Sequence, residues 1–567
     1  MAIKPPELLY GVDEQPPPAR LAILGLQYAV LIGVYLIFVV MVARAASASA
    51  EVTQDLVGLG FIVLAVGTFA QAYRGKFFGS GYLAPPVFSA IYIGPAILAA
   101  EAGGLPAVAG MTIFAGLTEA VLSRLLRRLR VVFQPTIAGF TVLVVGFELG
   151  LVGIAKTLEI GKQEPAYWPH VFVAFVTLAA AVALSIWGRG VWRLSSVLLG
   201  VVSGLAAALA WGIVDAAALT SIGAARWIAL PNPSFLSYSF EASLIPVFLA
   251  AGFAATLRTI GVVTTCQKIN DAEWKRPDLD NIEKGVLGDA VGAVAAGLLG
   301  CLGTSSAPSL VGVSSATGAT SRAIAFAAAS LLAVFAFLPK VAAAVTALPS
   351  EIAGAVLIFT ASFMITSGIE IVASRSLSTR ACFALSIGLL LGLATQVNAG
   401  YFRALPGPWN DVLGSMLTVS LAAAIGLTLL FRIGIRRKDA MVWRTSDALA
   451  GFGRFLDKEA AAWKLNAELV ERAKDGVAGV VAHLKEGHFI DAPLEISASY
   501  DGIDLLVELK YRGRAPSLGA VERGHETVHE EGAVTAGLKS FAAGAHADRT
   551  AVAVDRGNVS IKLWFSA

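Results

Sequence analysis

Residues 303–322 read GTSSAPSLVGVSSATGATSR, and they interrupt a series of apolar segments of membrane length. The neighbouring segments, VLGDAVGAVAAGLLGCL before and AIAFAAASLLAVFAFL after, have the composition of membrane helices. Gly, Ser, Thr and Pro therefore stand where a continuous helix would carry Leu and Ile. Backbone that breaks at membrane depth is tolerated only where it is buried in protein or lines a cavity. The stretch indicates either a loop at the membrane surface or a functional break inside the membrane.

The composition of the whole chain favours a membrane protein. Hydrophobic residues make up 56% of the 567 residues, and charged residues only 15%, whereas soluble domains carry about a quarter charged residues. Residues 1–20 are polar and Pro-rich and lack the pattern of a signal peptide, so we expect a cytoplasmic tail there. The net charge of +3 gives no indication of a nucleic-acid partner, and the three cysteines have no metal-ligand spacing. We expect no cofactor, no metal and no enzymatic activity.

Apolar runs near the ~20 residues that cross a bilayer recur up to residue 434. They predict fourteen spans, two of them short, at 21–43, 54–73, 86–101, 105–126, 136–156, 168–187, 194–215, 244–262, 285–302, 308–321, 323–339, 350–373, 381–397 and 412–434. Lys and Arg concentrate in the loops after even-numbered spans, as in the run 124–130. By the positive-inside rule, this pattern places both termini in the cytoplasm. We therefore expect a multi-pass α-helical protein of the bacterial inner membrane.

The two short spans have similar sequences. GSGYLAPPVFSAIY (79–92) and GTSSAPSLVGVSSA (303–316) each open with Gly and a hydroxyl residue, contain an Ala-Pro step and continue as a run of small residues. Short segments interrupted by Gly or Pro, one in each half of a chain, mark the substrate sites of transporters. A half-helix that starts at membrane depth directs free N–H groups and a positive dipole end at a ligand. The pair predicts a substrate site; the alternative is two re-entrant surface turns without a ligand.

Four stretches carry a resemblance to a known family: GLQY (25–28), SGYLAPPVFSAIY (80–92), TLRTIGVVTTCQKINDAEWKRPDLDNIEKGVLGD (256–289) and residues 303–322. Through them the chain resembles the nucleobase–ascorbate transporter family, which includes uracil and xanthine permeases, over residues 20–434. The resemblance implies fourteen spans arranged as two inverted seven-span repeats. It also implies a core domain (21–130 and 244–340) that moves against a gate domain (135–215 and 350–434), usually in a homodimer.

The resemblance places the substrate between the third and tenth half-helices, beside the eighth span. The candidate substrate-binding residues are Gln27, Tyr28, Val87, Phe88, Arg258, Ala307, Pro308, Ser309, Leu310 and Gly312. Several depart from the family pattern. Ser309 and Leu310 replace the Gln or Glu and the Asn of the signature, and Gln27-Tyr28 replaces a Gln-His pair. Arg258 aligns with the substrate-binding Glu of uracil permease, so a cation stands where a carboxylate would accept a nucleobase N–H.

Four side chains within the spans are singled out, and three of them have two possible roles. Arg258 is a candidate to pair with an anionic substrate, because a charge within the membrane is costly and is therefore found mainly at functional sites. Alternatively, its long side chain reaches out to the cytoplasmic surface. Glu119 is a candidate to carry a coupling proton, or it pairs structurally with Arg124 or Arg128. Phe88 stacks on a planar substrate or is an ordinary core aromatic. We expect Asp289 to lie near the N-terminus of the ninth span, where negative charge is favoured.

The composition changes near residue 436, after which no spanning run occurs. We expect a linker at 436–457 and a small soluble α+β domain on the cytoplasmic side at 458–567. The expected order is a helix (464–486), a hairpin (493–512), a lid, a helix (535–546) and a hairpin (549–565), which resembles the ATP-binding fold of anti-sigma-factor and histidine kinases. Gly479 replaces the Mg²⁺-chelating Asn of that fold, and its adenine-binding Asp is absent. This implies a degenerate domain that binds a cytoplasmic protein or a dimer mate; residual nucleotide binding and a metal site at His525 and His529 are the alternatives.

These features predict a secondary active transporter that moves a purine-like nucleobase of the xanthine or urate type, or a related small anionic solute, by an elevator mechanism. We expect the coupling ion to be H⁺ or Na⁺, and the partners to be the lipid bilayer and a second copy of the chain. Two alternatives stay open. One is transport of inorganic or carboxylate anions, as in sulfate permeases, which Arg258 would suit. The other is a membrane-anchored sensor whose core no longer transports.

Overall fold

The computed structural model describes residues 3–126, 135–158, 168–189, 192, 196–214, 220, 222–274, 277–373, 377–405, 409–431, 437–443, 450–463, 465, 467–486, 493–500, 504–513, 547, 549–555 and 558–566. The chain divides into two units, Met1–Gly426 and Leu427–Ala567, and each is described by itself. The expected helix at 535–546, as well as Arg128, His525 and His529, lies outside the described residues.

In its described residues, the first unit is helical apart from two short strands. Its helices are α1 (Pro18–Gly33), α2 (Ile37–Ala45), α3 (Ala50–Ala72), α4 (Ile93–Leu125), α5 (Pro135–Thr157), α6 (Trp168–Trp187), α8 (Ser196–Ala210), α10 (Ile245–Asn270), α11 (Leu279–Leu298), α12 (Pro308–Thr317), α13 (Arg322–Phe335), α14 (Pro339–Thr346), α15 (Ser350–Ala373), α16 (Thr379–Val397), α17 (Ala399–Arg403), α18 (Trp409–Gly414) and α19 (Met416–Phe431). The 3-10 turns η1 (Val34–Leu36), η2 (Ala90–Tyr92) and η3 (Ala242–Leu244) lead into α2, α4 and α10. Within the described part of the chain, eight helical stretches are long and apolar enough to cross a membrane, and the pair α13–α14, bent by 87°, would make a ninth.

Two helices extend beyond the bounds that hydropathy predicts. α10 continues to Asn270 instead of ending near residue 262, and α11 begins at Leu279 instead of residue 285. Asp278 accounts for the early start of α11, because its carboxylate accepts hydrogen bonds from the N–H groups of Asp280 and Asn281 as an N-cap. As a result, Asp289 lies in the interior of α11, and the expectation that it sits at a helix N-terminus is wrong.

The third and fourth predicted spans are one element, α4, with a kink. Gly103 and Gly104 have non-helical backbone angles, and Gly104 has φ of 68°, in the left-handed region that glycine tolerates best. The kink coincides with the predicted break between residues 101 and 105. We call the part from η2 to the kink the first half-helix, and α12 the second half-helix.

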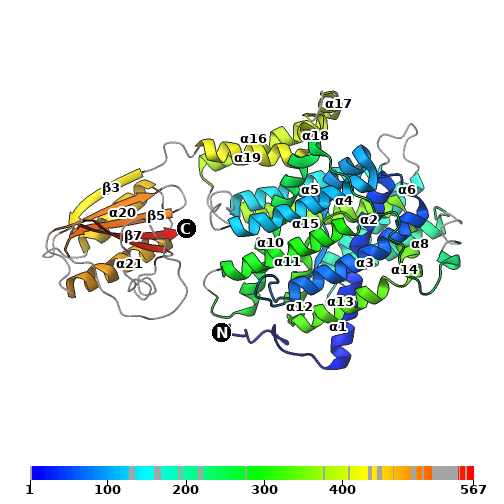
Figure 1. Ribbon diagram of the computed structural model, residues 1–567, viewed down its shortest axis with the longest axis horizontal. Coiled ribbons are helices and arrows are strands. Elements are labelled where there is room, and N and C mark those ends of the chain that lie inside the picture. Colours follow the sequence, from blue (N-terminus) through cyan, green and yellow to red (C-terminus); the bar gives the residue numbers. More distant parts are fainter. Residues whose placement is uncertain are drawn as a thin grey trace. The chain divides into compact units, whose positions relative to one another are not determined.

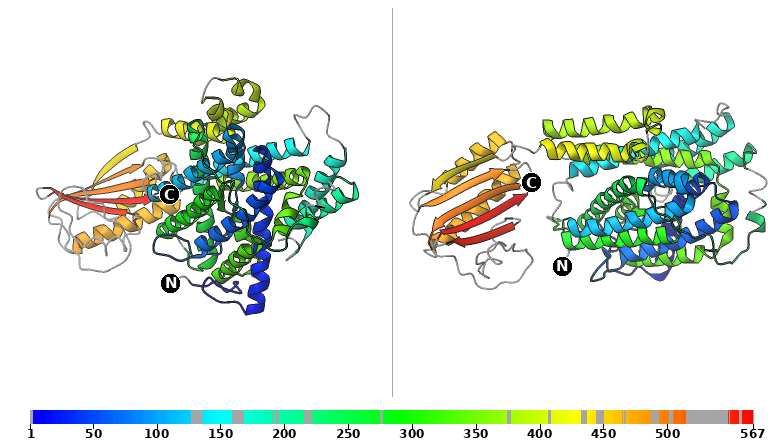
Figure 2. Two further views of the ribbon diagram at one scale, coloured as in Figure 1. Left: turned by 45° about the vertical axis from the view of Figure 1, so that its right-hand side comes forward. Right: turned by 45° about the horizontal axis from the view of Figure 1, so that its top comes forward.

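The helices form two packed groups. In the first group, α4 packs on α10 and α11, and α13 packs on α1 and α3; Figures 1 and 2 show these helices side by side. In the second group, α5 packs along α15, and α6 packs against α8 and α15. α5 and α15 approach very closely, since a Cβ atom on Gly368 would lie 2.6 Å from the backbone nitrogen of Leu143. Small residues of this kind let helix backbones come together within a membrane.

Two strands join the half-helices inside the first group. β1 (Pro86–Phe88) pairs antiparallel with β2 (Thr304–Ser306), with Val87 opposite Ser305. Both strands are buried throughout. The N–H of Ser89 donates to the carbonyl of Gly303 over 3.0 Å, which extends the pairing by one step. The stretch 303–322 is therefore a break whose backbone is paired within the protein, and the surface-turn alternative is wrong.

The second unit is an antiparallel sheet covered on one face by two helices. Its elements are β3 (Arg437–Trp443), α20 (Ala450–Trp463), α21 (Ala467–Glu486), β4 (Leu494–Tyr500), β5 (Asp504–Arg512), β6 (Arg549–Asp555) and β7 (Asn558–Ser566). The strand order is β3-β4-β5-β7-β6, and Figure 2 shows α20 and α21 against one side of the sheet. Val477, Val480 and Leu484 of α21 share one buried apolar cluster with Leu494 and Ile561 of the sheet.

The residues expected to form a linker, 436–457, contribute to this second unit. Arg437–Trp443 forms β3, which pairs with β4 over its full length, and α20 starts within the expected linker. Trp443 holds β3 against the second unit, because its side chain is buried in the core of that unit and is only 1% exposed. The charged residues Arg437, Lys438 and Asp439 obscure the strand pattern in the sequence.

Candidate functional site

Arg258 lies in the middle of α10 and reaches the start of the first half-helix. Its Nη1 donates a hydrogen bond to Oγ of Ser89 over 3.1 Å. Ser89 is the N-cap of η2, and its Oγ also accepts from the N–H of Ile91. Because Arg258 is partly buried and bonded within the protein, the expectation that it extends to the cytoplasmic surface is wrong.

Asp289 connects α10, α11 and β2 next to this arginine. Its carboxylate oxygens accept hydrogen bonds from Oγ1 of Thr259 and, over 3.0 Å, from Oγ of Ser306. The side chain is fully buried, and its negative charge interacts with the Arg258 guanidinium. A buried charge needs such compensation by hydrogen bonds and an opposite charge.

Glu119 is a second buried carboxylate, and it contacts the first half-helix. Its Oε1 accepts a hydrogen bond from the hydroxyl of Tyr92, the last residue of η2. Its Oε2 is buried and has no hydrogen-bond partner among the described residues. Arg124 instead pairs with Oε1 of Glu283 over 2.6 Å, so the expected pair between Glu119 and Arg124 is wrong.

The ring of Tyr92 also touches the second broken segment. A Cβ atom on Gly303, the residue before β2, would lie 2.6 Å from this ring. Tyr92 is fully buried, so it fills the space between the two broken segments. Glu119 is thus connected, through one side chain, to the crossing point of the half-helices.

The second half-helix has one buried and one exposed face. Ala307 and Leu310 are buried, whereas Pro308, Ser309 and Gly312 are exposed. A Cβ atom on Gly312 would meet no atom of the described residues within 4 Å. The N-cap residue, Ala307, has no polar side chain that could cap α12. Pro308 has no N–H, and the N–H of Leu310 donates to the carbonyl of Ala307 over 3.2 Å. The N–H of Ser309 and the open face around Gly312 can therefore receive a ligand.

The Gln27-Tyr28 pair lies behind α12. The hydroxyl of Tyr28 donates to the carbonyl of Leu310 over 3.1 Å and lies 2.7 Å from Oγ of Ser314. Tyr28 is only 1% exposed, so it holds the half-helix in place. Nε2 of Gln27 is buried, and no partner for it exists in the part of the chain that the structure describes.

Val87 and Phe88 are core residues in this structure. Both are buried, and the Phe88 ring lies 3.3 Å from the position of a Cβ on Gly60 in α3. The packing favours the ordinary core-aromatic interpretation of Phe88 over stacking on a ring. Sequence reasoning missed Ser89, Tyr92, Thr259 and Ser306. Ser89 could have been identified from the sequence as an N-cap, because Ser is a common residue before the first helical turn.

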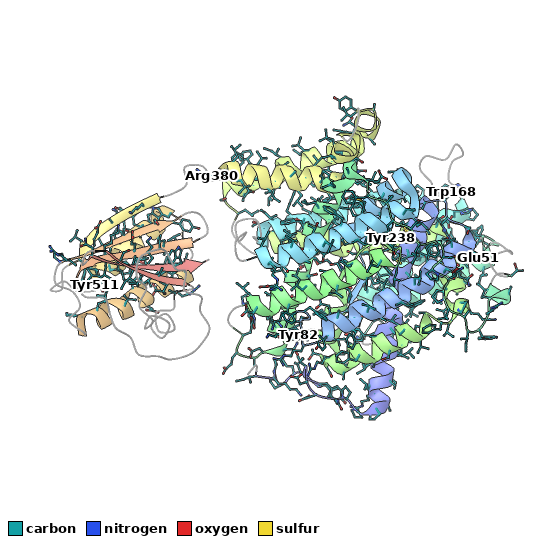
Figure 3. The ribbon with its side chains drawn as sticks, viewed as in Figure 1. Glu51, Tyr82, Trp168, Tyr238, Arg380 and Tyr511 are labelled. Carbon is teal, nitrogen blue, oxygen red and sulfur yellow. The ribbon has the colours of Figure 1, made fainter. Side chains whose placement is uncertain are left out.

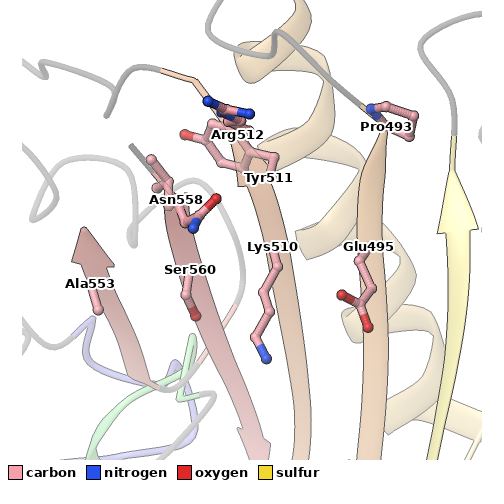
Figure 4. A pocket seen from close by; sticks show the side chains of 9 residues that line it. Pro493, Glu495, Lys510, Tyr511, Arg512, Ala553, Asn558 and Ser560 are labelled. Atoms are coloured by element: carbon pink, nitrogen blue, oxygen red, sulfur yellow. The ribbon is translucent and has the colours of Figure 1, made fainter. Parts of the chain in front are cut away.

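Two cavities lie away from the Arg258 cluster. One, of about 10 Å³, lies behind α12 between Tyr82, Cys266, Val311 and Ser314; Tyr82 is labelled in Figure 3. The other, of about 440 Å³, lies on the sheet of the second unit. Figure 4 shows Glu495, Lys510 and Ser560 on its neighbouring strands. Neither cavity contains the half-helix N-termini, so the charge cluster rather than cavity size identifies the candidate site.

Two half-helices joined by a short strand pair, with buried charges beside them, define a membrane transporter. Residues 19–399 match the profile of the Permease family of xanthine and uracil permeases. The chain belongs to this family, the nucleobase–ascorbate transporters. Because members of the family are transporters, the chain is a multi-pass transport protein and not an enzyme. The match ends before the second unit, and the resemblance of residues 458–567 to kinase ATP-binding domains stays a prediction.

Three relatives align along most of their length. A Clostridium perfringens protein assigned as a purine permease is 27% identical over 422 residues, covering 74% of this chain and 92% of the relative. The xanthine permease XanP of Escherichia coli K12 is 24% identical, covering 75% and 95%. The uric acid permease PucJ of Bacillus subtilis is 24% identical, covering 69% and 88%.

The fold is also similar to that of a solved transporter structure. The murine anion transporter Solute Carrier 26 family member A9, in its inward-facing state, superposes with a TM-score of 0.52. Its sequence identity is 9%, and the superposition covers 77% of this chain and 72% of the murine chain. The likeness supports the helical transporter fold alone.

Proposed function

We propose that the protein transports an oxopurine of the xanthine or urate type, in its anionic form, across the bacterial inner membrane. The observation that carries this proposal is the hydrogen bond between Arg258 and Ser89. It places a guanidinium at the N-terminus of the first half-helix, where negative charge is already favoured. The names of the relatives, which include xanthine and uric acid permeases, support the purine class.

The chemistry of the arginine favours a planar anion. A guanidinium presents several N–H donors in one plane and binds two neighbouring acceptor atoms at once. A deprotonated oxopurine offers such a pair in a carbonyl oxygen and an adjacent ring nitrogen. A carboxylate at the same position would instead accept N–H groups, as a neutral nucleobase requires. The substitution of the family's Glu by Arg258 therefore favours an anionic substrate.

The remaining candidate residues have separate roles in this proposal. Pro308, Ser309 and Gly312 form the face of α12 toward the substrate, because they are exposed. Tyr28 and Leu310 orient α12 through their hydrogen bond. Val87, Phe88 and Ala307 are buried and pack beneath the substrate face. Nε2 of Gln27 is a hydrogen-bond donor that is available for the substrate.

We propose further that a proton accompanies the substrate and binds Glu119. Among the described residues of this cluster, Asp289 and Glu119 place two buried carboxyl groups near the guanidinium of Arg258. An anionic substrate would add negative charge to a water-poor site, where uncompensated charge is costly, and a proton that enters with the substrate would offset that charge. Glu119 has an unpartnered oxygen that can take the proton, and Tyr92 donates to the other one.

The movement in this proposal is that of an elevator. The first packed group holds both half-helices and Arg258, and the second, built on the close α5–α15 pair, is the scaffold against which it moves. The proposal includes a fourteen-span arrangement, cytoplasmic termini and a homodimer joined through the scaffold.

Ligand-dependent thermal stabilisation of the purified full-length protein tests the proposal. A ligand that binds only the native state stabilises it by about 2.7 kcal/mol at a hundred times its Kd. We expect stabilisation by urate and xanthine, and none by uracil at neutral pH. Stabilisation by sulfate or carboxylates alone would replace the purine proposal with an inorganic-anion transporter. If none of these purines, pyrimidines, carboxylates and inorganic anions stabilises the protein, a sensor that no longer transports is favoured.

A further inference from the structure

The N-terminal residues 3–13 lie along one end of the first packed group, beside the second half-helix. We call them the N-terminal strap. Figure 1 shows this segment running from the N-terminus past the end of α12 to α1. The N–H of Tyr10 donates to the carbonyl of Gly318 over 3.0 Å, and the N–H of Thr320 donates back to the carbonyl of Tyr10 over 2.9 Å. Tyr10 and Ala319 thus form a parallel bridge.

Further contacts fix the strap on both sides of this bridge. The N–H of Arg322 donates to the carbonyl of Val12, and the Arg322 guanidinium pairs with Asp13 over 2.7 Å. At the other end, the N–H of Ile3 donates to Oδ1 of Asp271 over 3.0 Å. Leu8 is only 8% exposed, so its side chain anchors the strap between these points. The strap therefore contacts the residues that follow α10 and the turn that joins α12 to α13.

The second half-helix needs such support. α12 spans only Pro308–Thr317 and ends at Gly318, which has a left-handed φ of 64°. Isolated helices of this length are marginally stable in water, and their last carbonyl groups have no partner within the helix. Tyr28 holds the first turn of α12 through the carbonyl of Leu310 and contacts Ser314 one turn later. The strap fixes its C-terminal end at Gly318, and two fixed points determine where the N-terminal end points.

We propose that the N-terminal strap positions α12 so that its N-terminal end, with the N–H of Ser309, stays directed at the substrate beside Arg258. The strap contacts the opposite, C-terminal end of α12, so Tyr10 and Asp13 are positioning residues that do not touch the substrate. Two consequences follow. The first, that loss of the strap weakens substrate binding, rests on the proposed function. The second, that loss of the strap destabilises α12, does not.

Hydrogen exchange of the full-length protein without ligand tests the second consequence. Tyr10→Pro removes the N–H that bonds Gly318, and Asp13→Ala removes the ion pair with Arg322. Each lost hydrogen bond is worth about 1 kcal/mol, or about fivefold in an equilibrium constant. We expect the amides of residues 313–320 to exchange at least about fivefold faster in both variants. Asp13→Glu keeps the charge and should restore protection.

Transport kinetics test the first consequence. Strap variants should raise KM for urate about fivefold and leave kcat within about twofold, because the lost interaction affects binding in the ground state and the transition state alike. Glu7→Gln, at an exposed position of the same segment, is the control and should change neither value. Unchanged exchange at 313–320 in a variant lacking residues 2–13 would overturn the proposal. If the strap variants exchange faster but the wild type does not bind urate, the proposed role of the strap stands and the purine substrate is rejected.

Discussion

Arg258 and Ser89 join α10 to the first half-helix through one hydrogen bond of 3.1 Å. Ser89 also caps η2, so the arginine bonds the residue that starts the half-helix. The positive guanidinium and the positive end of a helix dipole lie together, an arrangement that negative charge stabilises; Asp289 supplies such a charge from within the protein, and an anionic substrate would supply a further one. This pair is therefore the centre of the proposed anion site.

Arg258→Lys tests whether substrate recognition needs the planar guanidinium or only its positive charge. Lysine keeps a positive charge but cannot bind two acceptors in one plane. We expect kcat/KM for urate uptake into proteoliposomes to fall about tenfold, which corresponds to about 1.4 kcal/mol. Arg226→Gln, at an exposed site, should behave as wild type. Full activity of Arg258→Lys would reject bidentate recognition in favour of simple charge attraction.

Ser89→Ala tests whether the serine acts through the arginine. The variant loses the acceptor for Arg258 and the N-cap of η2, and loss of an N-cap costs about 1 kcal/mol. We expect KM to rise about fivefold. If the two residues act as one unit, Ser89→Ala in an Arg258→Gln background should have little further effect, which a double-mutant cycle measures. Additive effects would show that Ser89 supports the half-helix independently of Arg258.

Glu119→Gln tests proton coupling. Glutamine keeps the size of the side chain and accepts the hydrogen bond from Tyr92, but it cannot exchange a proton. We expect urate-driven acidification of proteoliposomes to disappear and counterflow exchange to persist. Glu283→Gln removes the surface pair with Arg124 and serves as the control. Proton movement that continues in Glu119→Gln would assign coupling to another group, such as Asp289.

Two glycines of the second broken segment should respond differently to substitution. Gly312→Leu places a side chain on the open face of α12, where a Cβ meets no described atom within 4 Å. It should improve helix propensity by up to about 1 kcal/mol and yet abolish uptake by occupying the substrate side. Gly303→Ala would press a methyl group against the Tyr92 ring at 2.6 Å and should lower the melting temperature. Normal uptake by Gly312→Leu would remove that face from the site.

A chain that ends at Arg437 tests the role of the second unit. All residues of the candidate site lie within Met1–Gly426, so we expect the truncated protein to retain uptake in proteoliposomes. Loss of uptake with normal insertion and folding would assign the second unit a direct part in transport.

Hydropathy and one repeated motif were sufficient to predict a multi-pass helical transporter with two broken segments, whereas the exact number of spans and the substrate contacts stay predictions. Long apolar segments identify helices directly, and the shared Ala-Pro step identified the two segments that the structure joins through β1 and β2. The position of Asp289 was misjudged because α11 begins at Leu279, among polar residues that the hydropathy pattern left outside the span. Asp278 caps the start of α11, and at the end of α10 Nδ2 of Asn270 donates to the carbonyl of Cys266 over 2.8 Å.

The N-terminal strap and the partner of Glu119 could not be predicted from the sequence. The strap is held largely by backbone hydrogen bonds of Tyr10 and Val12, which leave no side-chain pattern. Glu119 was expected either to carry a coupling proton or to pair with Arg124 or Arg128, which follow it in the sequence. The tertiary packing of Tyr92 against Gly303 instead directs a phenol at the carboxylate.

Calorimetric titration of urate into the purified wild type, Arg258→Gln and Arg226→Gln tests the central claim most directly. A hydrogen bond to a charged group is worth about 1.5–3 kcal/mol, so we expect Arg258→Gln to bind urate at least about tenfold more weakly. Arg226→Gln should bind urate with the wild-type affinity. Equal urate affinity in all three proteins would contradict the account, because the guanidinium at the first half-helix would then have no part in recognition.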